Sequence, residues 1–116
     1  MLASEFRLTE SSDFDAVRDS GKRFVSANFT LSFLDRRDNK PCRFGFVIPT
    51  KVTKLASDRN RIKRVLSEAT RHNLVYLKPG FDCVYLPKNT ILRAYANAVM
   101  TEVRDALIAA GLTKAQ

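Results

Sequence analysis

Residues 43–66, RFGFVIPTKVTKLASDRNRIKRVL, contain the pattern that decides the fold. The apolar run from Arg43 to Ile48 predicts a strand, and Pro49 ends it because proline interrupts a hydrogen-bonded ladder. A basic loop is expected from Thr50 to Asp58, followed by a helix. The segment therefore predicts a strand and a helix that are joined by a positively charged loop.

The helix after this loop is expected to run from Arg59 to about Leu77, with Asp58 as its N-cap, and to end before Lys78-Pro79-Gly80. At about 100° per residue, one arc of the helix is apolar and is expected to pack on a sheet. That arc consists of Ile62, Val65, Leu66 and Ala69. The opposite side consists of Arg59, Asn60, Lys63, Arg64 and Arg71, with Arg61 near its edge.

Four cations within six residues at a helix N-terminus oppose the helix dipole and repel one another. Bound phosphates would relieve this repulsion, which favours phosphate binding over a merely solvated face. Lys51 and Lys54 extend the charge into the loop. Asn60 suits either of two roles: contact with a base edge, a 2′-hydroxyl or a hydrated metal ion, or a hydrogen bond to the backbone near the helix start.

The residues before this segment predict one helix and two strands. Ser12-Asp13-Phe14-Asp15 resembles a capping box and predicts a helix over 13–20, which ends at Gly21 in a left-handed conformation. A brief strand is expected at Phe24-Val25, and the alternation over 29–33 predicts another. Asp38-Asn39-Lys40-Pro41 is typical of a hairpin turn, which would make 43–48 the returning strand.

The residues after the basic helix predict one strand and one helix. Phe81 to Leu86 is nearly continuously apolar, as in strands that are buried on both faces. Asn89 or Thr90 is expected to cap a third helix, whose apolar stripe begins at Leu92 and ends at Ala110 before Gly111. The element order is α-β-β-β-α-β-α, which indicates an α+β two-layer sandwich with a mixed sheet.

The length of 116 residues predicts a single domain spanning 1–116, and the net charge of +8 indicates a polyanionic partner, either nucleic acid or an anionic membrane surface. Residues 51–71 contribute seven cations and two acids, so the charge is concentrated there. No apolar run approaches the ~20 residues of a membrane span, and the N-terminus lacks a secretion signal, which predicts a cytoplasmic protein without a membrane partner. Cys42 and Cys83 are expected to be buried thiols rather than a disulfide.

Catalytic and metal-binding patterns are missing from the sequence. His72 is the only histidine, the four glycines are isolated, and no zinc-ligand, nucleophile or phosphate-loop spacing is found. The sequence therefore predicts no catalytic residue and no metal site in this chain.

The strand 43–48, the basic loop and the hexad Arg59-Asn60-Arg61-Ile62-Lys63-Arg64 resemble the protein subunit of bacterial ribonuclease P. The likeness also covers Asp13-Phe14, Gly21 and the strand at Phe29, and it extends from Arg7 to Ala110. It implies a left-handed β-α-β crossover. It also implies a ribonucleoprotein in which the RNA subunit uses Mg²⁺ to cut the 5′ leader from precursor tRNA, while this chain alone holds no cofactor.

The resemblance implies two sets of site residues and no DNA partner. The residues expected to bind the catalytic RNA, or the metal ions near it, are Arg59, Asn60, Arg61, Lys63 and Arg64, with Lys51 and Lys54 in the loop. The positions expected to bind the leader, in a cleft between the sheet and the first helix, are Phe14, Arg18, Ser32 and Ser67. Plain core packing is an equally good interpretation of Phe14.

Four positions depart from the family pattern. Arg18 and Ser32 stand where relatives often carry aromatic residues, Ser67 stands at an arginine position, and Thr50 replaces the first of two lysines. Because stacking contributes ~1–3 kcal/mol per base, we expect weaker or differently selective leader contact. Arg18 could partly compensate by stacking its guanidinium plane or by pairing with a phosphate.

Two other functions fit the composition. A structural ribosomal or other double-stranded-RNA-binding domain would bind ribosomal RNA and would not stimulate cleavage of precursor tRNA. A self-sufficient nuclease would cleave precursor tRNA with magnesium and without an RNA subunit, although the sequence shows no carboxylate or histidine cluster for it.

Overall fold

The computed structural model describes residues 2–114. The main elements are α1 (Ser11–Ser20), β1 (Lys22–Val25), β2 (Phe29–Asp35), β3 (Arg43–Phe46), α2 (Ala56–Arg71), β4 (Phe81–Pro87) and α3 (Ala96–Ala109). Three short 3₁₀ helices, η1 (Ser4–Phe6), η2 (Leu74–Tyr76) and η3 (Asn89–Arg93), lie between them. The predicted α-β-β-β-α-β-α order and the α+β class are confirmed.

The four strands form one mixed sheet in the order β1-β2-β4-β3. β4 pairs antiparallel with β2 and parallel with β3, so β2 and β3 are not neighbours. The predicted hairpin between them is therefore wrong. β4 is buried on both faces and occupies the centre of the sheet, as its apolar sequence indicated. The turn residues instead contact the start of β4, where the Gly80 N–H donates to the Lys40 carbonyl over 2.8 Å.

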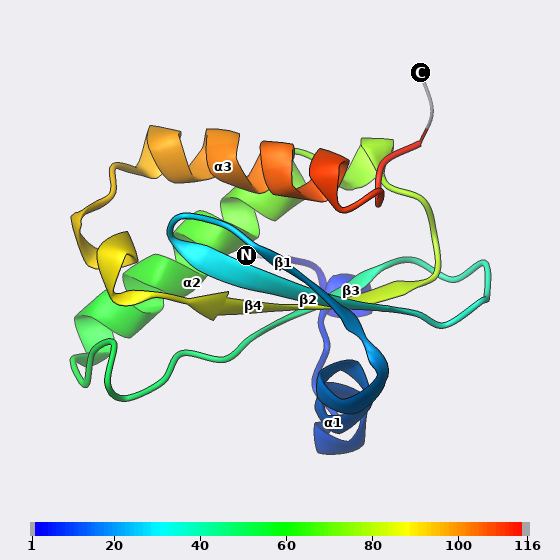
Figure 1. Cartoon of the computed structure of the whole chain (residues 1–116), viewed down its shortest axis with the longest axis horizontal. Helices are drawn as coiled ribbons and strands as arrows, with labels where there is room; N and C mark the ends of the chain where they lie inside the picture. The colour runs from blue at the N-terminus through cyan, green and yellow to red at the C-terminus, as the bar shows by residue number, and fades with distance from the viewer. Residues whose placement is uncertain (1, 115–116) are drawn as a thin grey trace.

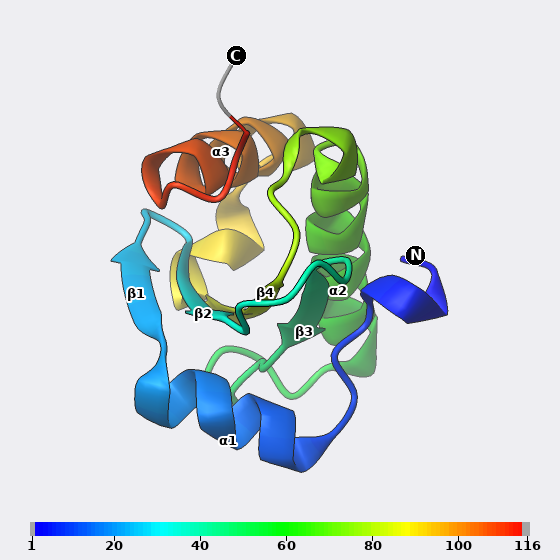
Figure 2. The same ribbon diagram turned by 90° about the vertical axis from the view of Figure 1, so that its right-hand side faces the viewer.

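The β3-α2-β4 connection has the uncommon hand. In Figure 2 the two parallel strands run away from the viewer, α2 lies above the sheet and β4 lies to the left of β3. This arrangement is a left-handed crossover, whereas nearly all such connections are right-handed. The expectation that the resemblance supplied is thus confirmed.

The helices lie on the two faces of the sheet unequally (Figures 1 and 2). α2 and α3 cover one face, and α1 alone lies across the other. The main core lies under α2 and α3, where Tyr85 stacks on Phe46 with ring centroids 5.6 Å apart. A smaller apolar cluster of Leu8, Val17 and Val84 lies under α1. One helix cannot cover a whole sheet face, so part of that face remains open.

Three predicted helix boundaries need correction. α2 begins at Ala56, so Asp58 lies in its first turn and accepts a hydrogen bond from the Thr53 hydroxyl over 3.0 Å. α2 ends at Arg71 rather than near Leu77, because the Asn73 side chain donates to the Ala69 carbonyl and the chain continues as η2. α3 begins at Ala96, since the residues from Asn89 form η3 instead.

The end of α1 also differs from expectation. α1 begins at Ser11 without a side-chain cap, and Gly21 has a φ of −82°, which is not left-handed. A Cβ atom at Gly21 would lie 2.4 Å from the Val17 carbonyl oxygen and 2.7 Å from the Phe33 carbonyl oxygen. Glycine is therefore needed here for close backbone approach between α1 and β2 rather than for a positive φ.

Cys42 and Cys83 are both buried and free, as predicted. Burial raises the pKa of each thiol, most strongly for Cys83, and an elevated thiol pKa disfavours the reactive thiolate. Both residues contribute to the main core.

Candidate nucleic-acid interface

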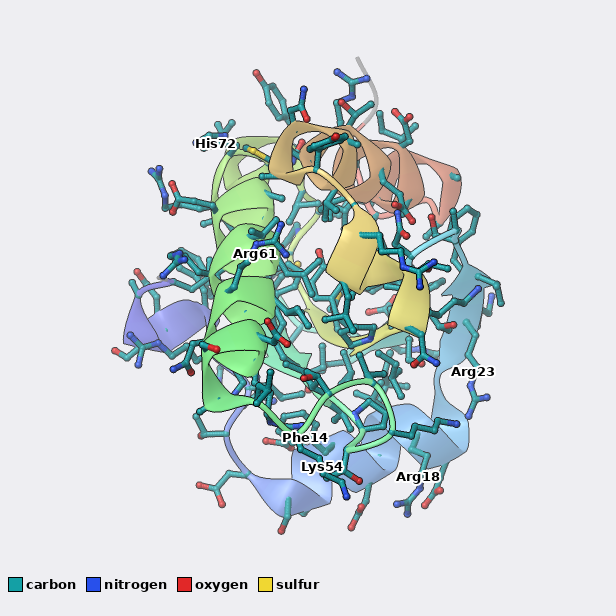
Figure 3. The ribbon with its side chains drawn as sticks, turned by 90° about the vertical axis from the view of Figure 1, so that its left-hand side faces the viewer. Phe14, Arg18, Arg23, Lys54, Arg61 and His72 are labelled. Atoms are coloured by element: carbon teal, nitrogen blue, oxygen red, sulfur yellow. The ribbon has the colours of Figure 1, made fainter. Side chains whose placement is uncertain are left out.

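The two sides of α2 have the polarity that the sequence predicted. Ile62, Leu66 and Ala69 are buried against the sheet and α3, and Val65 is half-buried. Asn60 and Arg64 are exposed, whereas Arg59, Arg61 and Lys63 are half-buried. The helix thus presents a row of cations to solvent along its outer side, where Figure 3 labels Arg61.

The cations in the first turns of α2 and in its loop have no acid partners in the part of the chain that the structure describes. Within residues 2–114, no acid lies within 4 Å of the cations predicted to bind RNA, which are Lys51, Lys54, Arg59, Arg61, Lys63 and Arg64. Five other arginines pair with carboxylates: Arg18, Arg36, Arg43, Arg104 and Arg71, which is the last residue of α2. Arg7, Arg23, Arg37 and Arg93 form no such pair within the described residues. The hydrogen bond from Arg71 lowers the pKa of Glu68, which keeps that carboxylate charged. The positive charge of the first turns of α2 is therefore uncompensated.

Backbone carbonyls orient two of these arginines. Arg59 donates to the Thr53 carbonyl over 3.1 Å, and Arg61 donates to the Ala94 carbonyl over 3.3 Å. Each guanidinium group has further donors, which are available to a ligand. Among the hydrogen bonds within residues 2–114, none involves the Asn60 side chain, so its predicted alternative role in bonding the backbone is not observed.

The loop before α2 extends this surface. Lys51 and Lys54 are exposed, and Lys51 lines a hollow together with Leu92 and Arg93 of η3. Because Arg61 is bonded to Ala94 just after η3, the loop, η3 and the start of α2 form one continuous surface.

An apolar cleft of about 180 Å³ lies on the other face of the sheet, beside α1. Its walls and floor are formed by Phe14, Asp15, Val17, Arg18, Arg23, Ser32, Val47, Val84 and Leu86. The cleft brings together three of the four positions that were predicted to bind the leader: Phe14, Arg18 and Ser32. Figure 3 shows Phe14 and Arg18 projecting from α1.

The fourth of these positions, Ser67, lies in a second hollow at the outer edge of β3, where the Leu8 N–H donates to the Phe44 carbonyl over 2.9 Å. This hollow of about 240 Å³ is lined by Ser67 and Lys63 of α2, by β3 and by Phe14, which it shares with the first cleft. The Ser67 hydroxyl is buried and has no hydrogen-bond partner within the described residues. Phe14 therefore stands between the cleft beside α1 and the cations of α2.

Arg23 is a charged residue of the cleft that the sequence patterns did not indicate. It lies on β1 as the direct cross-strand partner of Ser32 on β2, so the two side chains share a face of the sheet. Residues alternate between the two faces of the sheet along β1 and β2. This alternation places Arg23 beside Ser32 only once the register between the two strands is known.

A family model described as Ribonuclease P matches residues 2–111. A ribonuclease P protein component from a Cyanothece species is 34% identical, over 92% of this chain and 93% of its own length. This chain belongs to the bacterial ribonuclease P protein family. A relative from Legionella pneumophila is 37% identical over 71% of this chain and 68% of its own length.

Solved ribonuclease P proteins have the same fold. The protein from Staphylococcus aureus superposes with a TM-score of 0.85 over 94% of this chain and 98% of its own, at 16% identity. The protein from Thermotoga maritima gives 0.76 over 85% of this chain and 92% of its own, at 27% identity.

Family membership makes this chain a subunit of the ribonuclease P holoenzyme, a ribonucleoprotein of tRNA processing. It implies the RNA subunit and precursor tRNA as partners. Within residues 2–114, no three His, Cys, Asp or Glu side chains are grouped as metal ligands. None of the helices in that range has the length and hydropathy of a membrane span.

Proposed function

We propose that α2 and the loop before it bind the catalytic RNA subunit, and that the cleft beside α1 binds the 5′ leader of precursor tRNA. The observation that supports the first part is the set of six cations without acid partners, gathered on one helix and its loop. Their mutual repulsion and their opposition to the helix dipole destabilise the free protein. Contact with a phosphate backbone would reverse the sign of both effects.

The protein's contribution under this proposal is electrostatic. Neutralising RNA phosphates lowers the repulsion between the RNA subunit and precursor tRNA, while the Mg²⁺ ions and the cleavage chemistry belong to the RNA subunit. Arg59 and Arg61 would serve as bidentate phosphate ligands, Lys63 and Arg64 as further cations, and Asn60 as a donor to a base edge, a 2′-hydroxyl or a hydrated ion. The whole chain would then act as one RNA-binding domain in the cytoplasm, where precursor tRNA is made.

The leader part of the proposal is supported by the shape and polarity of the cleft. The cleft is open and mostly apolar, with the ring of Phe14 at one wall, as expected for a surface that accommodates stacked bases. Through Phe14 it adjoins the hollow that contains Lys63 and Ser67. A single strand in the cleft would therefore approach the RNA-binding side of α2 around the edge of the sheet.

Reconstitution tests this function. The protein is added to its cognate RNA subunit at low magnesium, and cleavage of precursor tRNA is measured with the RNA alone and the protein alone as references. We expect cleavage to require the RNA subunit and to be stimulated by the protein. Cleavage by the protein alone, or binding to ribosomal RNA without stimulation, would contradict the proposal.

Replacing Phe14 with alanine is expected to reduce the affinity of the holoenzyme for precursor tRNA with a long leader. The loss should be about fivefold to 150-fold, which corresponds to the ~1–3 kcal/mol of one base stacked on an aromatic ring. Precursor with a one-nucleotide leader should bind as it does to wild type. Affinities are measured by titrating holoenzyme into labelled precursor in Ca²⁺, which slows cleavage.

Val25→Ala is the matched control, because Val25 is an apolar side chain on β1 that is 66% exposed and lies outside the cleft. If Phe14→Ala lowers the affinity for both precursors by the same factor, Phe14 has a packing role and does not contact the leader.

A further inference from the structure

The cleft beside α1 contains two arginines that differ in their partners. Arg18 on α1 lies 3.2 Å from a carboxylate oxygen of Asp15 and 3.0 Å from one of Asp19. The hydrogen bond to Asp19, with the charges of Asp19 and Asp15, raises the pKa of Arg18. Arg18 is thus already neutralised by its own helix, and a phosphate would have to compete with two carboxylates for it.

Arg23 on β1 has no such partner. Within residues 2–114, no carboxylate oxygen lies within 4 Å of its guanidinium group, and its side chain is exposed. Figure 3 shows Arg18 and Arg23 on the same side of the molecule, one on α1 and the other on β1. Of the two cleft arginines, Arg23 is the one whose charge is uncompensated.

The register of the sheet places Arg23 beside the smallest residue of the cleft. Arg23 and Ser32 are direct partners in the antiparallel β1–β2 ladder, so their Cβ atoms point to the same face at a separation of about 5 Å. Ser32 lines the cleft, and its short, buried side chain occupies little of the cleft volume. The long arginine side chain can extend over this space toward the apolar floor formed by Val84 and Leu86.

We propose that Arg23 binds a phosphate of the 5′ leader, with Ser32 providing the space in which that contact forms. This inference rests on the proposed function, because it requires the leader to lie in the cleft. A guanidinium fork suits a phosphate, which has two terminal oxygens in reach of parallel N–H donors. Bases would then lie toward Phe14 and the apolar floor, and the backbone toward β1. Arg23 would therefore recognise the charge of the leader backbone and not the identity of its bases.

The test compares wild-type holoenzyme with Arg23→Ala on precursors that carry long or one-nucleotide leaders. We expect Arg23→Ala to weaken binding of the long-leader precursor about threefold to tenfold, the effect of one charge-assisted hydrogen bond at an exposed site. Binding of the short-leader precursor and of the RNA subunit should not change, which also shows that the variant folds. Lys22→Ala is the matched control, because it removes the same charge from the adjacent position of β1 and lies outside the cleft.

Neutral linkages in the leader identify the chemical group that is bound. Methylphosphonates are placed at one leader linkage at a time, and each substrate is titrated with both holoenzymes. At one or two linkages, the neutral substitution should lower the affinity of wild-type holoenzyme about threefold to tenfold. The same substitution should lower the affinity of the Arg23→Ala holoenzyme less than about twofold, because that variant already lacks the contact.

The possible outcomes separate the two proposals. If wild type and Arg23→Ala both bind the long-leader precursor more tightly, and by the same factor, the proposed Arg23 contact is contradicted and leader binding by the cleft is still supported. If neutral linkages affect both holoenzymes equally, the phosphate contact is wrong. If wild type binds both leader lengths equally, the proposed leader site fails, and the Arg23 contact fails with it.

Discussion

Replacing Arg59 and Arg61 together with alanine is expected to weaken binding of the RNA subunit by at least ~150-fold near 0.1 M salt. Each arginine stands for at least one charge-assisted contact to phosphate, and such contacts contribute roughly 1.5–3 kcal/mol apiece. The slope of log affinity against log salt should also fall by about 1.4 to 1.8, because two phosphates are no longer neutralised. Stimulation of precursor cleavage at low magnesium should decline in parallel.

The matched control for this variant is Arg71→Ala/Arg104→Ala, which removes the same formal charge. Both control residues are exposed, and both already pair with carboxylates, Arg71 with Glu68 over 2.6 Å and Arg104 with Asp105 over 3.3 Å. We expect the control to lose less than about threefold in affinity. Equal losses in the two double variants would show that the RNA responds to net charge alone. An unchanged affinity of the Arg59→Ala/Arg61→Ala variant for the RNA subunit would show that α2 does not contact that RNA.

The second large effect is on stability, at the carboxylate of Asp82. Asp82 lies on β4 with only 4% of its side chain exposed, and it accepts hydrogen bonds from Arg43 over 2.9 and 2.8 Å and from Arg36. Asp82→Ala would remove the buried carboxylate that Arg36 and Arg43 share, and would leave each guanidinium group with one partly exposed acid, Asp38 or Asp13. We expect the free energy of unfolding to fall by about 3–5 kcal/mol, as when one partner of a buried ion pair is removed.

Urea unfolding measures this loss, with Asp105→Ala as the exposed control, which should change stability by less than about 0.5 kcal/mol. The substitution should also weaken the attachment of α1 to the sheet, because Arg43 pairs with Asp13 of α1 over 3.3 Å. A destabilisation below about 1 kcal/mol for Asp82→Ala would contradict the structural role of this cluster.

The chain order of the elements was predictable from local patterns, but the pairing of the strands was not. Asp38–Pro41 has the composition of a hairpin turn, and composition alone does not show which strand lies beside which. The central position of β4 follows from its burial on both faces, a tertiary property that competes with the local turn signal. The left-handed crossover opposes the general preference, so only the resemblance could indicate it.

The same limit applies to the candidate sites. The cations of α2 were predictable because they lie on one helix, where spacing alone defines the face. The cleft combines residues from α1 and several strands, and the partnership of Arg23 with Ser32 depends on a register that no single segment specifies. By contrast, the acid partners of Arg18 lie three residues before it and one after it, so they could have been predicted.

Site-directed cleavage of the RNA subunit from α2 tests the central proposal most directly. An iron–EDTA group is attached to the thiol of the Ser57→Cys variant. Ser57 is an exposed residue of the first turn of α2, whereas the native cysteines are buried. Ala109→Cys serves as the reference, because the start of α2 and the end of α3 lie at opposite ends of the molecule (Figure 1). We predict strong, localised strand scission in the RNA subunit from position 57 and weak scission from position 109. No scission from position 57 in a complex that still forms would contradict RNA binding by α2.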